Sequence, residues 1–138
     1  MLAALNTKGE TIIKARKSRN HTEILFKHLK IPISIKKNKN YDLIKISGQK
    51  QFSGFNYNIP SDISSSAFFI VLTLLSKKSK LIIKNVNINP SRIGLINILK
   101  KMGVNVYFKN KKSYMGEKVA DILIKSSNKI KSINCPTN

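Results

Sequence analysis

Two segments of this 138-residue chain resemble each other, and this internal repeat is the feature that most limits the possible folds. Segment 11–35, TIIKARKSRNHTEILFKHLKIPISI, is similar to segment 81–108, LIIKNVNINPSRIGLINILKKMGVNVYF. Further along, DLIKISG at 42–48 recurs as DILIKSS at 121–127. A spacing of roughly 70 residues predicts a duplicated strand–helix–strand–strand unit, and so short a unit must pack against its copies to bury its apolar surface.

Hydrophobic periodicity predicts the elements within each unit. Short β-branched or alternating apolar runs predict strands, and apolar residues at helical spacing predict helices. Pro32 limits its strand to a sheet edge or a strand start, and Gly103 fits the left-handed position that ends a helix. The expected strands are 11–15, 31–35, 42–48, 80–86, 104–108 and 120–126, and the expected helices are 22–29, 64–75 and 92–102, with an extended segment at 55–60 and a polar hairpin region after 108.

The two ends of the chain predict a larger protein. The first residues, MLAALNTKGET, have the pattern of the last turns of an apolar helix, with Gly9 as the stop. The last residues, INCPTN, end where a turn would lead into another element. The length suits one typical domain or parts of two, and we expect an internal fragment.

The charge of the chain raises the possibility of nucleic-acid binding. There are 26 Lys and Arg against 6 Asp and Glu, which gives a formal net charge of +20. Phosphates attract such a surface, but only Arg16, Arg19 and Arg92 are arginines, and the lysines are spread along the whole chain. Specific phosphate and base recognition favours the bidentate Arg fork. We attribute much of the charge to A/T-rich codons for Lys, Asn and Ile, and keep a basic nucleic-acid-binding α/β module as an alternative.

Other classes of protein are disfavoured by single residues and run lengths. One cysteine, Cys135, excludes a disulfide framework within the chain, and it lies far from His21 and His28, so no metal cluster is expected. The longest apolar run, AFFIVLTLL at 67–75, is shorter than the ~20 residues of a membrane-spanning helix. The N-terminus lacks a basic-then-apolar signal pattern. We expect a soluble, cytoplasmic protein that needs no membrane.

The polar stretch KSRNHTE at 17–23 joins a predicted strand to a predicted helix. Asn20 and Glu23 have the spacing of a capping box. The cations of this stretch oppose the helix macrodipole, and an anion held by backbone N–H groups, the Ser18 hydroxyl and the Arg19 fork would remove that conflict. The residues alone leave a phosphate or carboxylate site and a plain solvated turn as equal alternatives.

Four motifs in order resemble the 5-enolpyruvylshikimate-3-phosphate synthase family, the 3-phosphoshikimate 1-carboxyvinyltransferases. The first, at 9–31, resembles the family pattern G-x-T-x-I/V followed by S/T-R-D-H-T-E. The others are IPSDISSSAFFIVLTLL at 59–75, LIIKNVNINPSRIGLINILKKMGVNV at 81–106 and GEKVADILIKSS at 116–127. Together they cover nearly the whole chain. The departures are Asn20 in place of Asp, Ser61 in place of Gly and Ser66 in place of Ala.

The resemblance implies a mixed α/β fold of two globular halves. Each half would hold three copies of a βαβαββ unit with the helices packed inside, an inside-out α/β barrel. Residues 1–60 would end the first-entered lobe, and residues 61–138 would start the second. Asp62 and Ser64 would cap the helix after the crossing, and Arg92 would orient its loop rather than bind a ligand.

The implied reaction moves the enolpyruvyl group of phosphoenolpyruvate onto the 5-hydroxyl of shikimate 3-phosphate and releases phosphate, in the pathway to chorismate and the aromatic amino acids. By motif position, Ser18 and Arg19 would contact shikimate 3-phosphate, with His21 a weaker candidate. Lys17 would be a solvated neighbour and His28 a surface residue. No cofactor is implied, and we expect a monomer at full length.

The family's catalytic groups have no counterpart among these residues, so we expect the isolated chain to be inactive. The related UDP-N-acetylglucosamine enolpyruvyl transferases share the fold and the donor, and remain an alternative. The motifs SRNHTE and NPSRIG favour the shikimate enzyme over that alternative.

Overall fold

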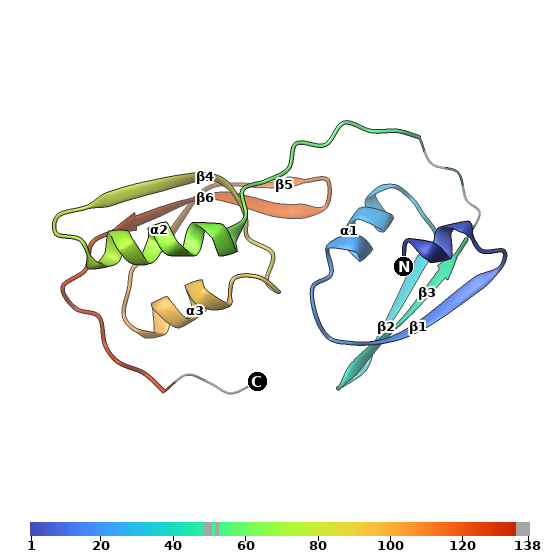
Figure 1. Ribbon diagram of the computed structural model, residues 1–138, viewed down its shortest axis with the longest axis horizontal. Coiled ribbons are helices and arrows are strands. Elements are labelled where there is room, and N and C mark those ends of the chain that lie inside the picture. The colour runs from blue at the N-terminus through green and yellow to red at the C-terminus, as the bar shows by residue number, and fades with distance from the viewer. Residues whose placement is uncertain (49–50, 52, 135–138) are drawn as a thin grey trace. The chain divides into compact units, whose positions relative to one another are not determined.

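The computed structural model describes residues 1–48, 51 and 53–134, and its chain divides into two compact units, Met1–Tyr57 and Asn58–Asn138. Each unit contains one three-stranded antiparallel sheet (Figure 1). The helices within the described ranges all fall short of the length and apolar character needed to cross a membrane. The assignment of the two units to two lobes of a larger enzyme stays a prediction.

The first unit follows the order strand, helix, strand, strand. Its elements are the 3-10 helix η1 (Ala3–Asn6), β1 (Glu10–Arg16), α1 (His21–His28), β2 (Ile33–Lys37) and β3 (Tyr41–Ser47). The last strand, β3, lies between β1 and β2 and runs antiparallel to both. Pro32 directly precedes the edge strand β2, as predicted, because proline has no N–H to donate to a ladder.

The second unit repeats that order after an additional helix. Its elements are α2 (Ile63–Leu75), β4 (Lys80–Asn87), α3 (Gly94–Lys101), β5 (Tyr107–Tyr114) and β6 (Glu117–Lys125). Its last strand, β6, is again central, in the order β4-β6-β5. The predicted duplication is therefore confirmed as two βαββ units, and α2 begins the second one, as expected.

The helices of the two units end in the same way. Lys30 follows α1 with φ +56°, and Gly103 follows α3 with φ +84°. In each case the next residue then donates a backbone hydrogen bond into the last turn, from Ile31 to Phe26 at 2.9 Å and from Val104 to Leu99 at 3.0 Å. Gly103 thus has the predicted left-handed conformation, which glycine adopts without a Cβ clash.

The prediction for β5 was wrong in its position. We expected a strand at 104–108, whereas β5 covers Tyr107–Tyr114. The polar hairpin expected after 108 is present, because β5 and β6 pair antiparallel across a short turn. Val104 and Val106 are buried in the core of the second unit, so their alternation reflects burial and not membership of a ladder. The strand itself is an exposed edge whose residues are set by backbone pairing with β6.

The N-terminal prediction was only partly right. Instead of the last turns of an α-helix, residues Ala3–Asn6 form the 3-10 helix η1, with Ala4 buried. Gly9 follows with φ +82°. A left-handed glycine ends this segment as expected, but the preceding backbone is wound more tightly than an α-helix.

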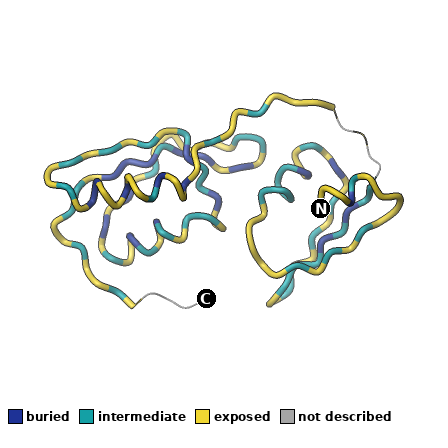
Figure 2. The backbone as a smooth tube through the Cα atoms, in the orientation of Figure 1, coloured by how far each residue is buried: buried dark blue, intermediate teal, exposed yellow. Residues whose placement is uncertain are grey.

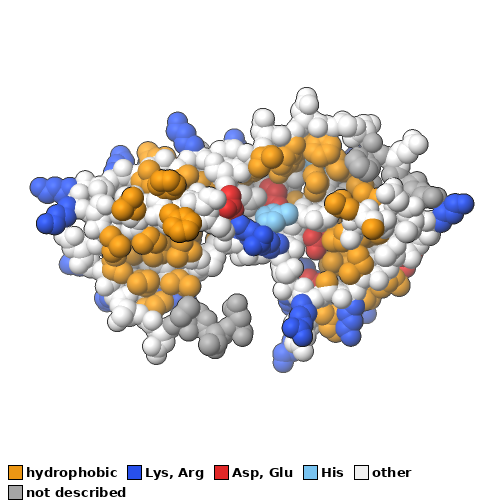
Figure 3. All heavy atoms as spheres, in the orientation of Figure 1, with side chains coloured by type: hydrophobic (Ala, Val, Ile, Leu, Met, Phe, Trp, Pro, Cys, Tyr) orange, Lys and Arg blue, Asp and Glu red, His pale blue; other side chains and the backbone are white. Residues whose placement is uncertain are grey.

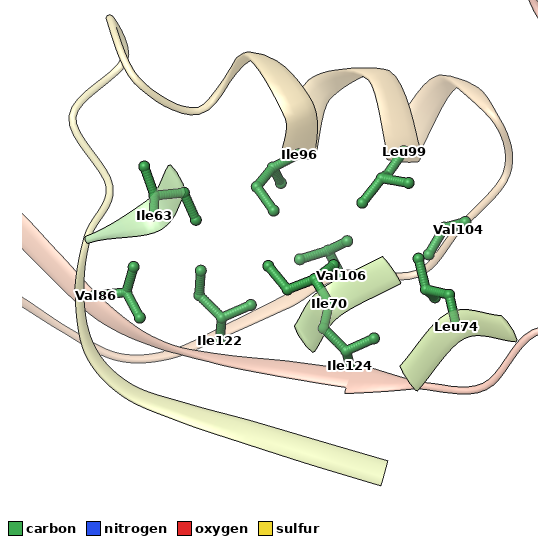
Figure 4. Close-up of a cluster of buried hydrophobic side chains, with 10 residues drawn as sticks. All are labelled: Ile63, Ile70, Leu74, Val86, Ile96, Leu99, Val104, Val106, Ile122 and Ile124. Atoms are coloured by element: carbon green, nitrogen blue, oxygen red, sulfur yellow. The ribbon is translucent and has the colours of Figure 1, made fainter. Parts of the chain in front are cut away.

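Each unit has its own hydrophobic core, and buried residues occur in the helices and in the strands of both units (Figure 2). Phe26 of α1 is 2% exposed and is a large buried side chain of the first unit. In the second unit both helices, the strands β4 and β6 and the segment after α3 supply core residues. Figure 4 shows them: Ile63, Ile70, Leu74, Val86, Ile96, Leu99, Val104, Val106, Ile122 and Ile124. The buried hydrophobic residues of the two units thus form two separate clusters.

Helix α2 also has an apolar face that its own unit leaves exposed. Phe68, Phe69, Leu72 and Leu75 are between 61% and 79% exposed. The space-filling view shows hydrophobic side chains gathered on this side of the second unit (Figure 3). A helix that is apolar all round is normally buried on all sides, so this face has the character of a packing surface.

Candidate functional site

The sequence-predicted site residues lie together in the turn between β1 and α1. β1 ends at Arg16, and α1 begins at His21, three residues after Ser18. Ser18 and Arg19 are exposed, and His21 is half-buried as the first residue of the helix. The buried Phe26 anchors α1 and so fixes the direction in which this turn leaves the sheet.

The predicted capping box is absent from this turn. Asn20 occupies the N-cap position, but its side chain makes no capping hydrogen bond, and its backbone has φ −121° and ψ 26°. An N-cap side chain reaches the free N–H groups from an extended backbone conformation, which Asn20 does not have. The side-chain capping that the sequence suggested therefore does not explain why these polar residues are here.

Ser18 and Arg19 are available to an external ligand. Among the described residues, neither side chain forms a hydrogen bond or an ion pair with another. The guanidinium of Arg19 carries five donors, and the first turn of α1 offers backbone N–H groups that have no partner within the helix. An exposed cation, a hydroxyl and a helix N-terminus together suit a phosphate or carboxylate.

The second unit has a Ser–Arg pair at the same place in its repeat. Ser91 and Arg92 stand three and two residues before the first residue of α3, as Ser18 and Arg19 do before α1. Since both helices also end alike, the two turns are equivalent positions of the duplicated unit. The second turn therefore provides an internal comparison for the first.

In the second unit the arginine is already occupied. A guanidinium nitrogen of Arg92 donates hydrogen bonds to Oδ1 of Asp62 at 2.7 Å and to Oγ of Ser64 at 2.8 Å. The other carboxylate oxygen of Asp62 accepts hydrogen bonds from the backbone N–H of Ser65 at 2.9 Å and from its hydroxyl at 3.1 Å. Asp62 thus caps α2, as predicted. The hydroxyl of Ser64 does not cap the helix and instead accepts a hydrogen bond from Arg92. Arg92 orients this loop, as expected.

The environment of Asp62 favours its ionised form. The backbone N–H of Ser65 is the largest cause that lowers the pKa of this carboxyl, and the charge of Arg92 contributes in the same direction. Partial burial opposes both effects. The N-terminus of α2 and the Arg92 guanidinium both stabilise the negative charge of Asp62.

A buried polar pair shapes the loop that carries Arg92. Asn89 and Glu117 are 2% and 5% exposed, and the amide of Asn89 donates to the carboxylate of Glu117 at 3.1 Å. The side-chain oxygen Oδ1 of Asn89 accepts hydrogen bonds from the N–H and the hydroxyl of Ser91 at 2.9 and 2.8 Å. Sequence reasoning missed this pair, although both residues lie within the quoted motifs, because nothing local indicates that they meet.

The remaining residues considered in the sequence are the second histidine, the potential metal ligands and the cysteine. His28 is exposed in the last turn of α1, as predicted for a surface residue. Among the residues the structure describes, no group of three His, Cys, Asp or Glu side chains is placed to hold a metal ion. Cys135 lies outside the described residues.

Comparison with known proteins identifies the family. The model of the EPSP synthase (3-phosphoshikimate 1-carboxyvinyltransferase) family matches residues 1–137. The chain is 43% identical to the 3-phosphoshikimate 1-carboxyvinyltransferase of Ruthia magnifica over 99% of its own length and 30% of the relative's. With the enzyme of Petrotoga mobilis it shares 43% identity over 92% of the chain and 29% of the relative.

A solved structure agrees with the sequence comparison. The EPSP synthase from Acinetobacter baumannii superposes with a TM-score of 0.82 and 36% identity, over 98% of this chain and 30% of that one. The chain thus spans about 30% of the length of the relatives that it matches. The residues of both turns, the order of the motifs and these matches lead to one conclusion: the chain belongs to the EPSP synthase (3-phosphoshikimate 1-carboxyvinyltransferase) family.

Proposed function

We propose that a full-length protein carrying this segment transfers the enolpyruvyl group of phosphoenolpyruvate to the 5-hydroxyl of shikimate 3-phosphate and releases phosphate. In this proposal the segment supplies Ser18, Arg19 and, more weakly, His21 to the shikimate 3-phosphate site. The reaction needs no cofactor, the enzyme is a cytoplasmic monomer, and the isolated segment has no turnover. Both substrates are anions, which suits a protein with so large a positive charge.

The difference between the two Ser–Arg turns carries the substrate part of this proposal. In the second unit, Arg92 binds the carboxylate of Asp62, which also accepts a helix N–H. In the first unit, Arg19 has no such carboxylate among the described residues. The phosphate of shikimate 3-phosphate would supply at Arg19 the anion that Asp62 supplies at Arg92.

The exposed face of α2 supports a proposal about the fold of the full-length protein. We propose three βαβαββ copies in each of two lobes, with residues 1–60 in one lobe and 61–138 in the other. Phe68 and Leu72, which are 79% and 64% exposed, would then pack against a neighbouring copy. Burial of such side chains contributes about 1.5–3 kcal/mol each, enough to favour packing of the copies.

The test of the proposed function is a phosphate-release assay on the full-length protein with phosphoenolpyruvate and shikimate 3-phosphate. Arg19→Gln should lower kcat/KM for shikimate 3-phosphate about 10- to 100-fold, because a charge-assisted hydrogen bond to the phosphate is lost. Lys27→Gln, an exposed cation in the last turn of α1, is the matched control and should change little. Binding of shikimate, which lacks the phosphate, should be much less affected by Arg19→Gln.

Two results would count against the proposal. Equal losses in the two variants would mean that the overall charge matters and the Arg19 position does not. Phosphate release by the isolated 138-residue chain above the buffer background would refute its predicted inactivity.

A further inference from the structure

In the second unit the regular pairing of the central strand β6 is interrupted on both sides. The pairing of β4 with β6 shifts register between Ile83 and Val86, and the pairing of β5 with β6 shifts between Lys109 and Lys112. Each irregularity contains an asparagine in the left-handed conformation, Asn85 with φ +53° in β4 and Asn110 with φ +50° in β5. Bulges of this kind redirect side chains and often adjoin functional sites.

One carboxylate of β6 connects the two bulges. Oδ1 of Asp121 accepts the backbone N–H of Asn85 at 2.8 Å, and Oδ2 accepts the side-chain amide of Asn110 at 2.7 Å. The hydrogen bond from Asn85 is the largest cause that lowers the pKa of Asp121. The carboxylate is therefore ionised and fixed in place at neutral pH.

A cavity of about 370 Å³ lies at this point and is lined entirely by residues of the second unit. Its lining includes Asp121, Lys84 and Lys112, and Ala120 and Tyr114 contribute apolar surface. This volume is within the range of small-molecule sites. Charged and amide groups stand beside apolar surface here, so the cavity can recognise a small ligand with a charged group.

The two lysines give the cavity its positive charge. Among the described residues neither Lys84 nor Lys112 forms an ion pair, yet the charge of each acts on Asp121. Both lysines are exposed, and they line the same cavity as one carboxylate whose oxygens already hold hydrogen bonds from Asn85 and Asn110. The excess positive charge and the free N–H donors of the lysines suit a small anion.

Asp121 restricts which anion fits. A carboxylate repels a ligand that has only acceptors, but it can accept a hydrogen bond from a ligand that carries a hydroxyl group. We propose that this cavity, which we name the bulge pocket, binds a phosphate group that carries a proton or an adjacent hydroxyl, with Lys84 and Lys112 on the phosphate oxygens and Asp121 as the acceptor. The bulge pocket shares no residue with the Ser18–Arg19 turn.

Titration of the 138-residue chain with inorganic phosphate at constant ionic strength, followed by amide NMR, tests the inference. Saturable shifts are expected at Asn85, Asn110 and Asp121. The Lys84→Gln/Lys112→Gln variant should bind phosphate at least about 10-fold more weakly, because two charge-assisted hydrogen bonds are lost. The control, Lys80→Gln/Lys125→Gln, removes two exposed lysines that pair at the far end of the same sheet and do not line the pocket, and should bind within about 2-fold of the parent.

Sulfate separates the proposed chemistry from general anion attraction. It resembles phosphate in size and carries no proton at neutral pH, so phosphate should bind several-fold more tightly. Equal binding of sulfate would overturn the role of Asp121, and equal losses in the two lysine variants, or shifts that do not saturate, would overturn the site. Glycerol 3-phosphate distinguishes between two natural ligands of the pocket. If it binds more tightly than inorganic phosphate, the ligand is a phosphorylated metabolite; if it binds more weakly, the ligand is the free phosphate ion.

Discussion

The guanidinium of Arg92 donates a 2.7 Å hydrogen bond to the carboxylate of Asp62, thirty positions earlier in the chain. The same carboxylate caps α2 through the N–H of Ser65. One ion pair thus joins the start of α2 to the loop before α3. It also shows that the arginine of a Ser–Arg turn in this repeat can pair with an anion.

Asp62→Ala should lower the free energy of unfolding of the second unit by about 1–2 kcal/mol, because it removes both the cap and the partner of Arg92. Asp62→Asn keeps an acceptor for Ser65 and should cost only about 0.5 kcal/mol. Urea unfolding measures both. Arg92→Gln should have less effect in the Asp62→Asn background than in the parent, and full additivity would mean that the ion pair does not couple the two residues.

Acid should destabilise the second unit through Asp62 and Asp121. The pKa of each carboxyl is lower in the folded chain than its ordinary value, so the unfolded chain binds more protons just below that value. The two carboxylates make their full contribution to the free energy of unfolding above about pH 5. This contribution is lost as the pH falls from about 4 through the pKa values of the folded chain. Unfolding measured at several pH values should give a shallower acid decline for Asp62→Asn/Asp121→Asn than for the parent. Parallel curves would contradict this prediction.

The equivalent residues that end α1 and α3 should respond in opposite directions to substitution. Lys30 has φ +56°, and replacement by glycine should stabilise the first unit by about 0.5–1 kcal/mol, since the left-handed conformation strains a residue with a Cβ. Gly103 has φ +84°, and Gly103→Ala should destabilise the second unit by about 1 kcal/mol. Hydrogen exchange resolves the two units separately. A loss of stability in Lys30→Gly would show that its side-chain contacts outweigh the backbone strain.

Polar substitutions on the exposed face of α2 should leave the isolated chain folded. Phe68→Gln/Leu72→Gln should change the free energy of unfolding by no more than about 0.5 kcal/mol and should reduce binding of a hydrophobic dye. The matched control is Ile70→Gln, at a position with 0% exposure, which should cost more than about 3 kcal/mol. Equal destabilisation by the two would mean that the face is already buried.

The proposed packing of copies adds a second expectation for this face. In the full-length protein, Phe68→Gln/Leu72→Gln should destabilise the lobe by several times the value measured in the isolated chain, because the proposed neighbouring copy loses its apolar contact. The thermal midpoint of both forms measures the difference. An unchanged midpoint at full length would count against the inside packing of α2.

The sequence was sufficient for patterns that are local or repeated. The Ile12-Ile13-Lys14 and Ile82-Ile83-Lys84 similarity predicted two copies of one unit, and those stretches lie in β1 and β4. Gly103 and the cap at Asp62 were also predicted correctly, because a left-handed helix end and a helix N-cap depend on a few adjacent residues. The first candidate turn, 17–23, was likewise visible as an excess of polar residues between two apolar runs.

Long-range contacts decided the rest. The alternation of Val104 and Val106 resembled a strand but arises from packing into the core of the second unit, whereas the polar strand β5 is defined by hydrogen bonds to β6. Asn20 and Glu23 had the spacing of a capping box, yet the backbone angles of Asn20 do not allow it. Hydrophobic periodicity indicates which side chains are buried, but it does not indicate which backbone groups pair with one another.

The sequence by itself determined the duplicated unit, the order of its elements and the family to which the chain belongs. Only the tertiary structure decided that Arg92 is occupied by Asp62, that Asn89 meets Glu117 in the interior, and that Asp121 holds two bulges around a cavity. These partners are separated by between 11 and 36 positions. Their pairing follows from strand register and helix packing, which bring distant residues together by burying apolar surface that no local pattern of polar residues encodes.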